Sequence, residues 1–340
     1  MMYRWTRATG IMAAMVVIGC GGSEPLTTDS DEQKPRVAYV TNGIADFWTI
    51  ADAGAKKGAE EFGADLQVLM PANGIGDQKQ QIEDLLSQGI DGLAVSPIDP
   101  VNQTELLNEV AENTILITHD SDAPESNRQV YIGMDNYLAG RMCGELVEEA
   151  LPEGGEVMIL VGRMEQDNAR RRRQGVIDQL MGRPVNADNF DAPGEVIRND
   201  KYVILDTLTD QFDRAKAKAN AEDTLSRYPD VPWMVGLFTY NPPLCLESLQ
   251  QAGKLGQVKV VAFDEAEETL QGITDGSVYG TVVQNPFEYG RQSVRVLVEL
   301  VGGNKAIIPE NLFIDIPARQ IRQDNVATYW SELNEKLERK

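Results

Sequence analysis

Short apolar runs alternate with longer amphipathic segments along the chain from residue 36 onward. A short apolar run bounded by turn residues predicts a buried strand, and apolar residues at intervals of three and four predict a helix. We therefore expect strands at 36–41, 65–70, 92–95 and 114–118, and helices at 47–62, 78–88 and 101–112. Gly63 and Gly89 directly follow two of these helices, at the position where glycine favours helix termination.

The same alternation restarts near residue 130. It predicts strands at 130–133, 156–161, 202–205, 233–238, 258–263 and 279–283, and helices at 137–150, 169–181, 214–228, 242–252, 265–271 and 287–301. Such alternation predicts parallel sheets with helices on both faces. Two doubly wound α/β domains account for the number of repeats better than one large sheet, and a single TIM barrel is the alternative architecture.

The N-terminal residues differ from this pattern. Arg4 and Arg7 precede nine uncharged, mostly apolar residues at 11–19, far fewer than the roughly 20 needed to cross a bilayer. A basic start followed by a short apolar stretch predicts a secretory signal peptide over residues 1–19. Residues 17–20 resemble the lipobox of bacterial lipoproteins, which implies lipidation of Cys20. A soluble export signal with a chance cysteine is the alternative. Residues 20–35 are polar and predict a flexible tether.

Composition excludes several classes of partner. The 340 residues include 53 acidic and 31 basic side chains, a net charge of −22, so we expect no nucleic-acid partner and no attraction to an anionic membrane surface. The chain has one histidine, His119, and three cysteines, and neither a CxxC nor an HExxH motif occurs. We therefore expect no metal and no cofactor. Cys143 and Cys245 lie in apolar helical runs, which favours buried thiols, although a disulfide stays possible in an oxidising compartment.

Polar and aromatic residues gather where the predicted strands end. Ligands of open parallel sheets bind beyond the carboxyl ends of the strands. Carboxylates, amides and arginine can bind neighbouring hydroxyl groups through paired hydrogen bonds, and aromatic rings can pack on the apolar faces of a sugar. The sequence thus indicates a polyhydroxylated ligand. The polar residues are Thr41, Asn42, Ser96, Asp120, Ser121, Arg163–Asn168, Arg170, Asn241, Asp264, Gln284 and Asn285, accompanied by Phe47, Trp48, Phe212, Tyr240 and Phe263.

Each of these residues also has a purely structural interpretation. Asp120, Asp264 and Asn241 could cap the segments that follow them. Phe47 and Trp48 could belong to the core, and His119 could be a structural histidine. Consecutive residues of a helix point about 100° apart, so at most one or two arginines of the run at 170–173 could face a cleft.

The order and spacing of these motifs resemble the periplasmic sugar-binding proteins of ABC importers, the ribose-binding-like group of the type I binding fold, over roughly residues 36–322. The similar segments are 37–41, 46–48, 88–97, 117–122, 132–140, 168–172, 212–214, 239–241, 261–264 and 283–290. The resemblance implies ligand contacts at Thr41, Phe47, Trp48, Asp120, Arg170, Phe212, Asn241, Asp264 and Gln284. Ser121 and Ala45 stand where ribose binders have arginine and asparagine, which argues against ribose itself, and residues 186–199 have no evident counterpart.

We therefore expect two Rossmann-like lobes joined by a multi-strand hinge near Asp135, Gln284 and Phe313. The first lobe would comprise 36–134 and 285–313, the second 135–284 and 314–325, and a tail would follow at 326–340. Hinge closure on a monosaccharide or polyol would precede delivery to an ABC permease.

This interpretation describes a non-enzymatic monomer in the periplasm or at the cell surface, attached to a bacterial membrane only through its lipid. Presentation of the ligand to a transmembrane sensor is an alternative. Acid–base hydrolysis of a glycoside by Asp120 and Asp264 is a second alternative.

Overall fold

The computed structural model describes residues 34–337. The predicted signal peptide, Cys20 and most of the tether lie outside the described residues. The described chain forms two separate sheets, each doubly wound, which confirms the predicted fold class and excludes the TIM barrel.

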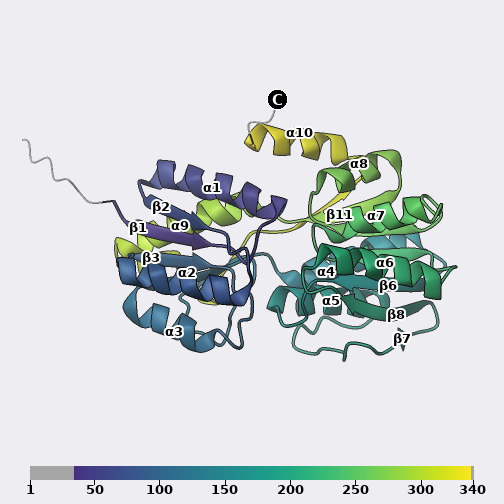
Figure 1. The fold of residues 1–340 in the computed structure, drawn as a ribbon, viewed down its shortest axis with the longest axis horizontal. Helices are drawn as coiled ribbons and strands as arrows, with labels where there is room; N and C mark the ends of the chain where they lie inside the picture. Colours follow the sequence, from purple (N-terminus) through teal and green to yellow (C-terminus); the bar gives the residue numbers. More distant parts are fainter. Residues whose placement is uncertain (1–33, 338–340) are drawn as a thin grey trace, which may run out of the picture. The chain divides into compact units, whose positions relative to one another are not determined.

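The first sheet is entirely parallel and has the strand order β12-β5-β4-β3-β1-β2. Val37 and Tyr39 pack under one helix pair, while Ala38 and Val40 pack under the other, because successive strand residues face opposite sides. We call this sheet and its four helices the first lobe (Figure 1). Its elements are β1 (Arg36–Val40), β2 (Asp65–Leu69), β3 (Gly92–Val95), β4 (Ile115–His119), β5 (Tyr131–Gly133) and β12 (Phe313–Asp315), with α1 (Asp46–Phe62) and α9 (Pro286–Val301) on one face and α2 (Ile75–Gln88) and α3 (Thr104–Asn113) on the other.

The second sheet has the order β13-β11-β10-β9-β6-β8-β7, with a parallel centre and antiparallel edge strands β13 and β7. We call this sheet and the helices against it the second lobe. Its strands are β6 (Gly155–Val161), β7 (Ile197–Arg198), β8 (Tyr202–Thr209), β9 (Trp233–Gly236), β10 (Lys259–Phe263), β11 (Val278–Val283) and β13 (Arg319–Arg322). Its helices are α4 (Asn136–Ala150) and α5 (Asp167–Leu180) on one face, and α6 (Arg214–Arg227), α7 (Asn241–Gln251) and α8 (Glu267–Asp275) on the other.

The chain passes between the two sheets three times, after β5, after β11 and after β12. The first two crossings lie at the predicted positions, near Asp135 and Gln284. The third lies after Asp315, because β12 continues to pair with β5 up to Asp315↔Gly133. A 3₁₀ turn, η1 (Lys305–Ile307), connects α9 to this region.

The last element of the described chain is a packed helix. Helix α10 (Val326–Lys336) buries Val326, Tyr329 and Leu333 in the same apolar cluster as α8 and Ile50 of α1. These three positions follow helical spacing and form one apolar face. The charged residues between them hide this pattern, which explains why the segment reads as polar.

Glycine allows close packing of the helix pair that carries part of the site. A Cβ on Gly140 of α4 would overlap the backbone carbonyl of Arg172 in α5. A Cβ on Gly175 of α5 would likewise overlap the carbonyl of Tyr137 in α4. Helices α4 and α5 therefore contact each other through their backbones.

Candidate functional site

Two aspartates lie at the carboxyl ends of central strands, one in each lobe. Asp120 follows β4 with φ 59°, and Asp264 follows β10 with φ 65°. This left-handed conformation is tolerated by aspartate better than by most side chains. Both residues are almost fully buried, so each carboxyl group depends on protein partners in place of water.

Asp120 has partners from both lobes. In the first lobe Ser96 Oγ donates to its Oδ2 at 3.1 Å, and Asn42 Nδ2 lies 3.5 Å from the same oxygen. In the second lobe Asn168 Nδ2 lies 3.5 Å from Oδ2, and Arg172 Nη2 lies 3.8 Å from Oδ1. Burial raises the pKa of Asp120 to about 7, although the Arg172 charge acts in the opposite direction.

Asp264 accepts hydrogen bonds from a side chain that follows β9 and from one at the second crossing. Thr239 Oγ1 donates to its Oδ2 at 2.6 Å, and Gln284 Nε2 donates to its Oδ1 at 2.8 Å. Tyr289 OH in turn donates to Gln284 Oε1 at 3.2 Å. Burial raises the pKa of Asp264, and the nearby Arg172 cation opposes that rise.

Arg172 supplies the positive charge near both carboxylates. Its side chain is 1% exposed and lies over the Phe263 ring, 4.3 Å from the centroid. Its Nε donates to Asn136 Oδ1 at 2.9 Å, and its Nη1 donates to the Leu237 carbonyl at 3.3 Å. Nη2 has no hydrogen-bond partner among the described residues. A buried guanidinium with a free donor is well suited to an added acceptor group.

Arg170, the arginine that the sequence indicated, is not part of this cluster. Its side chain is 37% exposed, its Nη2 lies 3.3 Å from Asp167 Oδ1, and its guanidinium lies over the Phe190 ring. Residues two positions apart on a helix point roughly 200° apart. Arg172 and Arg170 therefore face opposite directions, and Arg172 is the arginine whose guanidinium approaches Asp120.

A further acidic group, Asp210, was missed by the sequence analysis. Tyr240 OH donates to its Oδ1 at 2.5 Å, Asn241 Nδ2 donates to its Oδ2 at 2.9 Å, and the Phe212 amide donates at 2.8 Å. Burial raises its pKa. Asn241 Oδ1 is buried without a partner among the described residues. Asp210 follows β8, whose end at Thr209 is four residues later than the sequence predicted.

The remaining predicted residues pack in the apolar clusters of the two lobes or make local hydrogen bonds. Phe47 and Trp48 are buried against each other edge to face, with ring centroids 4.8 Å apart, and they belong to the first lobe's apolar cluster. Trp48 Nε1 donates to Asn42 Oδ1 at 3.1 Å. Thr41 Oγ1 donates to the Gly43 carbonyl. The Phe212 ring lies edge-on to Phe238, 5.4 Å between centroids.

His119 is a structural residue. It stacks on Tyr39 with 3.9 Å between centroids, and its Nε2 lies 3.2 Å from the Val40 carbonyl. Burial lowers its pKa to about 3, so the ring is neutral at physiological pH. Cys143 and Cys245 are both buried and unpaired, which confirms the default prediction of free thiols.

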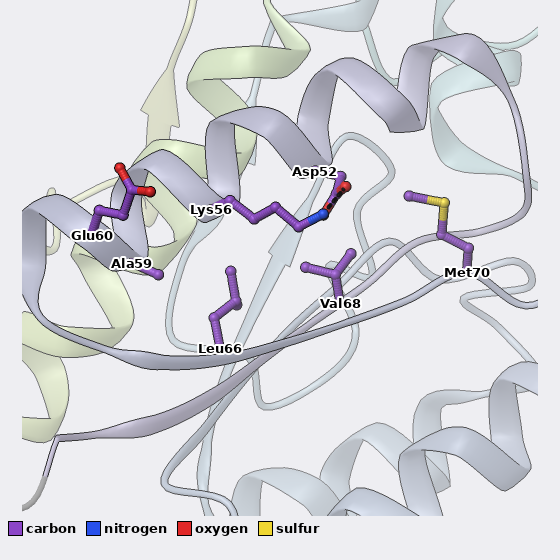
Figure 2. A pocket seen from close by; sticks show the side chains of 7 residues that line it. All are labelled: Asp52, Lys56, Ala59, Glu60, Leu66, Val68 and Met70. Carbon is purple, nitrogen blue, oxygen red and sulfur yellow. Dashed lines mark hydrogen bonds and ion pairs between the residues drawn. The ribbon is translucent and has the colours of Figure 1, made fainter.

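A hollow of about 620 Å³ lies elsewhere, between α1 and the edge strand β2. Figure 2 shows Lys56 bonded to Asp52 above Leu66, Val68 and Met70. This hollow is wide open and lined mainly by aliphatic side chains and an ion pair that is already formed. We therefore place the candidate site at the strand ends, where buried polar groups from both lobes meet. Within residues 34–337, no helix combines the length and apolar character that a membrane span requires.

Comparison with known proteins agrees with this architecture. The periplasmic binding protein domain family matches residues 28–305, and the chain therefore belongs to that family. Ribose import binding protein RbsB of Escherichia coli (strain K12) is 26% identical over 279 residues, which cover 80% of this chain and 86% of that protein.

Solved structures resemble the chain over most of its length. A solute-binding protein of an ABC transporter from Burkholderia graminis C4D1M, in complex with D-arabinose, has a TM-score of 0.77 and 28% identity. The match covers 87% of this chain and 97% of that one. GanP, a glucose-galactose binding protein from Geobacillus stearothermophilus, has a TM-score of 0.77 at 23% identity, covering 86% of this chain and 99% of its own. These likenesses confirm the type I periplasmic binding fold.

Proposed function

We propose that this protein is an extracytoplasmic solute-binding lipoprotein that captures a monosaccharide or polyol between its lobes and delivers it to an ABC permease. The observation that carries the proposal is the meeting of Asp120 from the first lobe with Asn168 and Arg172 from the second. The relatives' names agree with it: they include import proteins for ribose and a binding protein solved with D-arabinose.

The chemistry of the cluster suits hydroxyl groups. A ligand hydroxyl both donates and accepts, so a carboxylate and a guanidinium side by side can bind two neighbouring hydroxyls. The proposed ligand contacts are Asp120, Arg172, Asn241, Asp264 and Gln284, with Phe47, Trp48 and Phe212 packing on the ligand's apolar faces and Thr41 at the end of β1. Arg172 replaces Arg170 in this set because Arg170 points away from it.

Closure would depend on the ligand. A ligand that touches only one lobe has the same affinity for the open and closed arrangements and shifts nothing. A sugar that contacts Asp120 and Asp264 together favours the closed arrangement, and the three crossings are the segments that bend. Lipidation at Cys20 would keep the protein near a permease, and the polar residues 20–35 would give it reach.

A thermal-unfolding screen with monosaccharides and polyols tests this function. A sugar at about 100 times its Kd stabilises the folded state by about 2.7 kcal/mol, so a ligand will raise Tm. Asp264→Asn keeps a residue that tolerates φ 65° but loses the charge, and Asp264→Ala removes the side chain. We expect both to abolish the shift.

The matched control is Asp65→Asn, on the exposed start of β2, which should keep the full shift. The proposal fails if no sugar or polyol stabilises the wild type, or if the Asp264 variants respond as strongly as the control.

A further inference from the structure

Two of the crossings between the lobes carry the same arrangement of side chains. At the second, Gln284 links Asp264 of the second lobe to the Tyr289 hydroxyl of the first. At the first, Asn136 Nδ2 donates to the Tyr131 hydroxyl at 3.2 Å, while Asn136 Oδ1 accepts from Arg172 Nε at 2.9 Å. In both places one amide joins a charged residue of the second lobe to a tyrosine of the first.

The link at the first crossing is part of a closed ring of contacts. Tyr131 OH donates to the backbone carbonyl of Asp120 at 2.8 Å, and the Asp120 carboxylate faces Arg172 Nη2 at 3.8 Å. Asp120, Tyr131, Asn136 and Arg172 are therefore connected in a circuit that passes through the crossing, and all four are buried. A search for polar residues directly after predicted strands does not reveal Asn136, because this residue follows the crossing and begins helix α4.

We propose that Asn136 is a positioning residue for Arg172 and that, through Tyr131, it couples the orientation of the guanidinium to the position of the lobes. This inference rests on the proposed function. Asn136 orients Arg172 because its carbonyl accepts from Nε while the Leu237 carbonyl accepts from Nη1. These two bonds fix the plane of the guanidinium and leave Nη2 directed at Asp120.

The coupling follows from which contacts a hinge motion changes. Asn136 and Arg172 belong to helices α4 and α5, whose backbones touch at Gly140, so their separation is fixed. Tyr131 belongs to β5 of the first lobe and stacks on Phe313 of β12, 5.3 Å between centroids. A rotation about the crossing therefore changes the Tyr131–Asn136 bond first. Because Asn136 also accepts from Arg172, a displaced Asn136 changes the orientation of the arginine that would bind the ligand.

A double-mutant cycle tests the positioning role. The probe is the sugar that stabilises the wild type most, with Kd measured by calorimetry. We expect Asn136→Ala to weaken binding about tenfold or more, because Arg172 Nε loses a charge-assisted hydrogen bond. In an Arg172→Met background the same change should alter Kd less than about twofold, because nothing remains to be positioned. Independent, additive losses in the cycle would overturn the inference.

Tyr131→Phe tests the coupling, and it keeps the inference testable if the Asn136→Ala protein does not fold. It removes one hydroxyl and keeps the stacking on Phe313. Its matched control is Tyr202→Phe, which removes a partly buried hydroxyl that donates to the Leu151 carbonyl within the second lobe. Both variants should unfold at similar temperatures without ligand. We expect only Tyr131→Phe to weaken sugar binding, by about threefold to tenfold.

The outcomes separate the two proposals. If the wild type binds no sugar, the proposed function fails. If the wild type binds but Tyr131→Phe binds as tightly as the wild type, or no more weakly than Tyr202→Phe, the coupling through Tyr131 is wrong while the function stands. Additive losses in the double-mutant cycle would in turn show that Asn136 does not position Arg172.

Discussion

Four consecutive arginines on α5 point in different directions, because each successive side chain turns by about 100° around the helix. Arg170 and Arg171 both pair with Asp167 near the start of the helix. Arg172 points into the site. Arg173 points toward the sheet, where its Nε donates to Thr207 Oγ1 at 2.8 Å and its Nη1 to the Asp191 carbonyl at 2.7 Å. Arg173 thereby anchors the additional segment around residues 186–199.

These environments predict opposite results for two substitutions of the same kind. Arg172→Met should weaken sugar binding about 100-fold or more, because it removes the cation between two buried carboxyl groups. Arg170→Met should change Kd less than about twofold, because the Arg170 guanidinium lies over Phe190 and beside Asp167, away from Asp120 and Asp264. Calorimetric titration of both variants with the same sugar measures the difference. Comparable losses in the two variants would contradict this assignment of the arginines.

The sequence predicts that an arginine of this run faces the ligand but cannot identify which one. Helix phase is normally read from apolar residues, and four adjacent arginines remove that reference over a full turn. The neighbouring Ala169 and Val176 are buried, and their positions are consistent with an inward Arg172 once the sheet is known. Asp120, Asp264 and Gln284 directly follow strands, which is the position that the sequence indicates for candidate residues, whereas Asn241 begins α7 after β9 has ended at Gly236.

At the scale of elements, the position where β8 ends decides which residues reach the site. The apolar run at 202–205 stops at Asp206, which predicts a short strand. In the structure β8 continues to Thr209 because Thr207 faces inward and accepts from Arg173. A buried polar partner on another element thus extends the strand, and a single sequence does not show that partner. Asp210 escapes detection for the same reason.

The backbone contact between α4 and α5 gives a prediction at this scale. Gly140→Ala would place a methyl group against the Arg172 carbonyl, so the helices must separate at a cost of about 1–3 kcal/mol. Sugar binding should weaken as well, since α5 carries Arg172 and Asn168. Urea unfolding and calorimetry measure the two effects.

Gly76→Ala on α2 is the matched control, because its Cβ would meet no atom within 4 Å. It should stabilise the protein by about 0.4–1 kcal/mol without changing Kd. A Gly140→Ala protein as stable as the wild type would show that the helices do not depend on this contact.

Over the whole molecule, burial of carboxyl groups sets the expected response to pH. Burial raises the pKa of Asp120, Asp167, Asp210, Asp264 and Glu265. Neither carboxylate oxygen of Glu265 has a hydrogen-bond partner among the described residues, and helix α10 covers this residue with Tyr329. Arginine or lysine partners instead lower the pKa of Glu61, Glu149 and Glu247. These three groups therefore change the free energy of unfolding only at lower pH.

The sign of the effect follows from proton binding. Asp120 has a pKa of about 7 in the folded protein against an ordinary 3.8, so between these values the folded state holds more protons than the unfolded state. The contribution of Asp120 to stability therefore falls as pH rises through that window. Glu265 acts in the same direction, because its pKa is also raised. A chain with a net charge of −22 adds self-repulsion in the same range.

His119 acts in the opposite direction, because its pKa of about 3 in the folded protein lies below the ordinary 6.5. The contribution of Asp120 is therefore measured as the difference between a variant and the wild type, by urea unfolding of the ligand-free proteins at a series of pH values. Asp120→Asn carries no charge at any pH, so it should match the wild type near pH 4 and exceed it at pH 8 by up to about 4 kcal/mol. Glu265→Gln should also exceed the wild type at pH 8, but it should retain sugar binding, whereas Asp120→Asn should lose it. Asp65→Asn, on the exposed end of β2, should follow the wild-type curve. An Asp120→Asn curve parallel to the wild type would show that burial of Asp120 does not carry this cost.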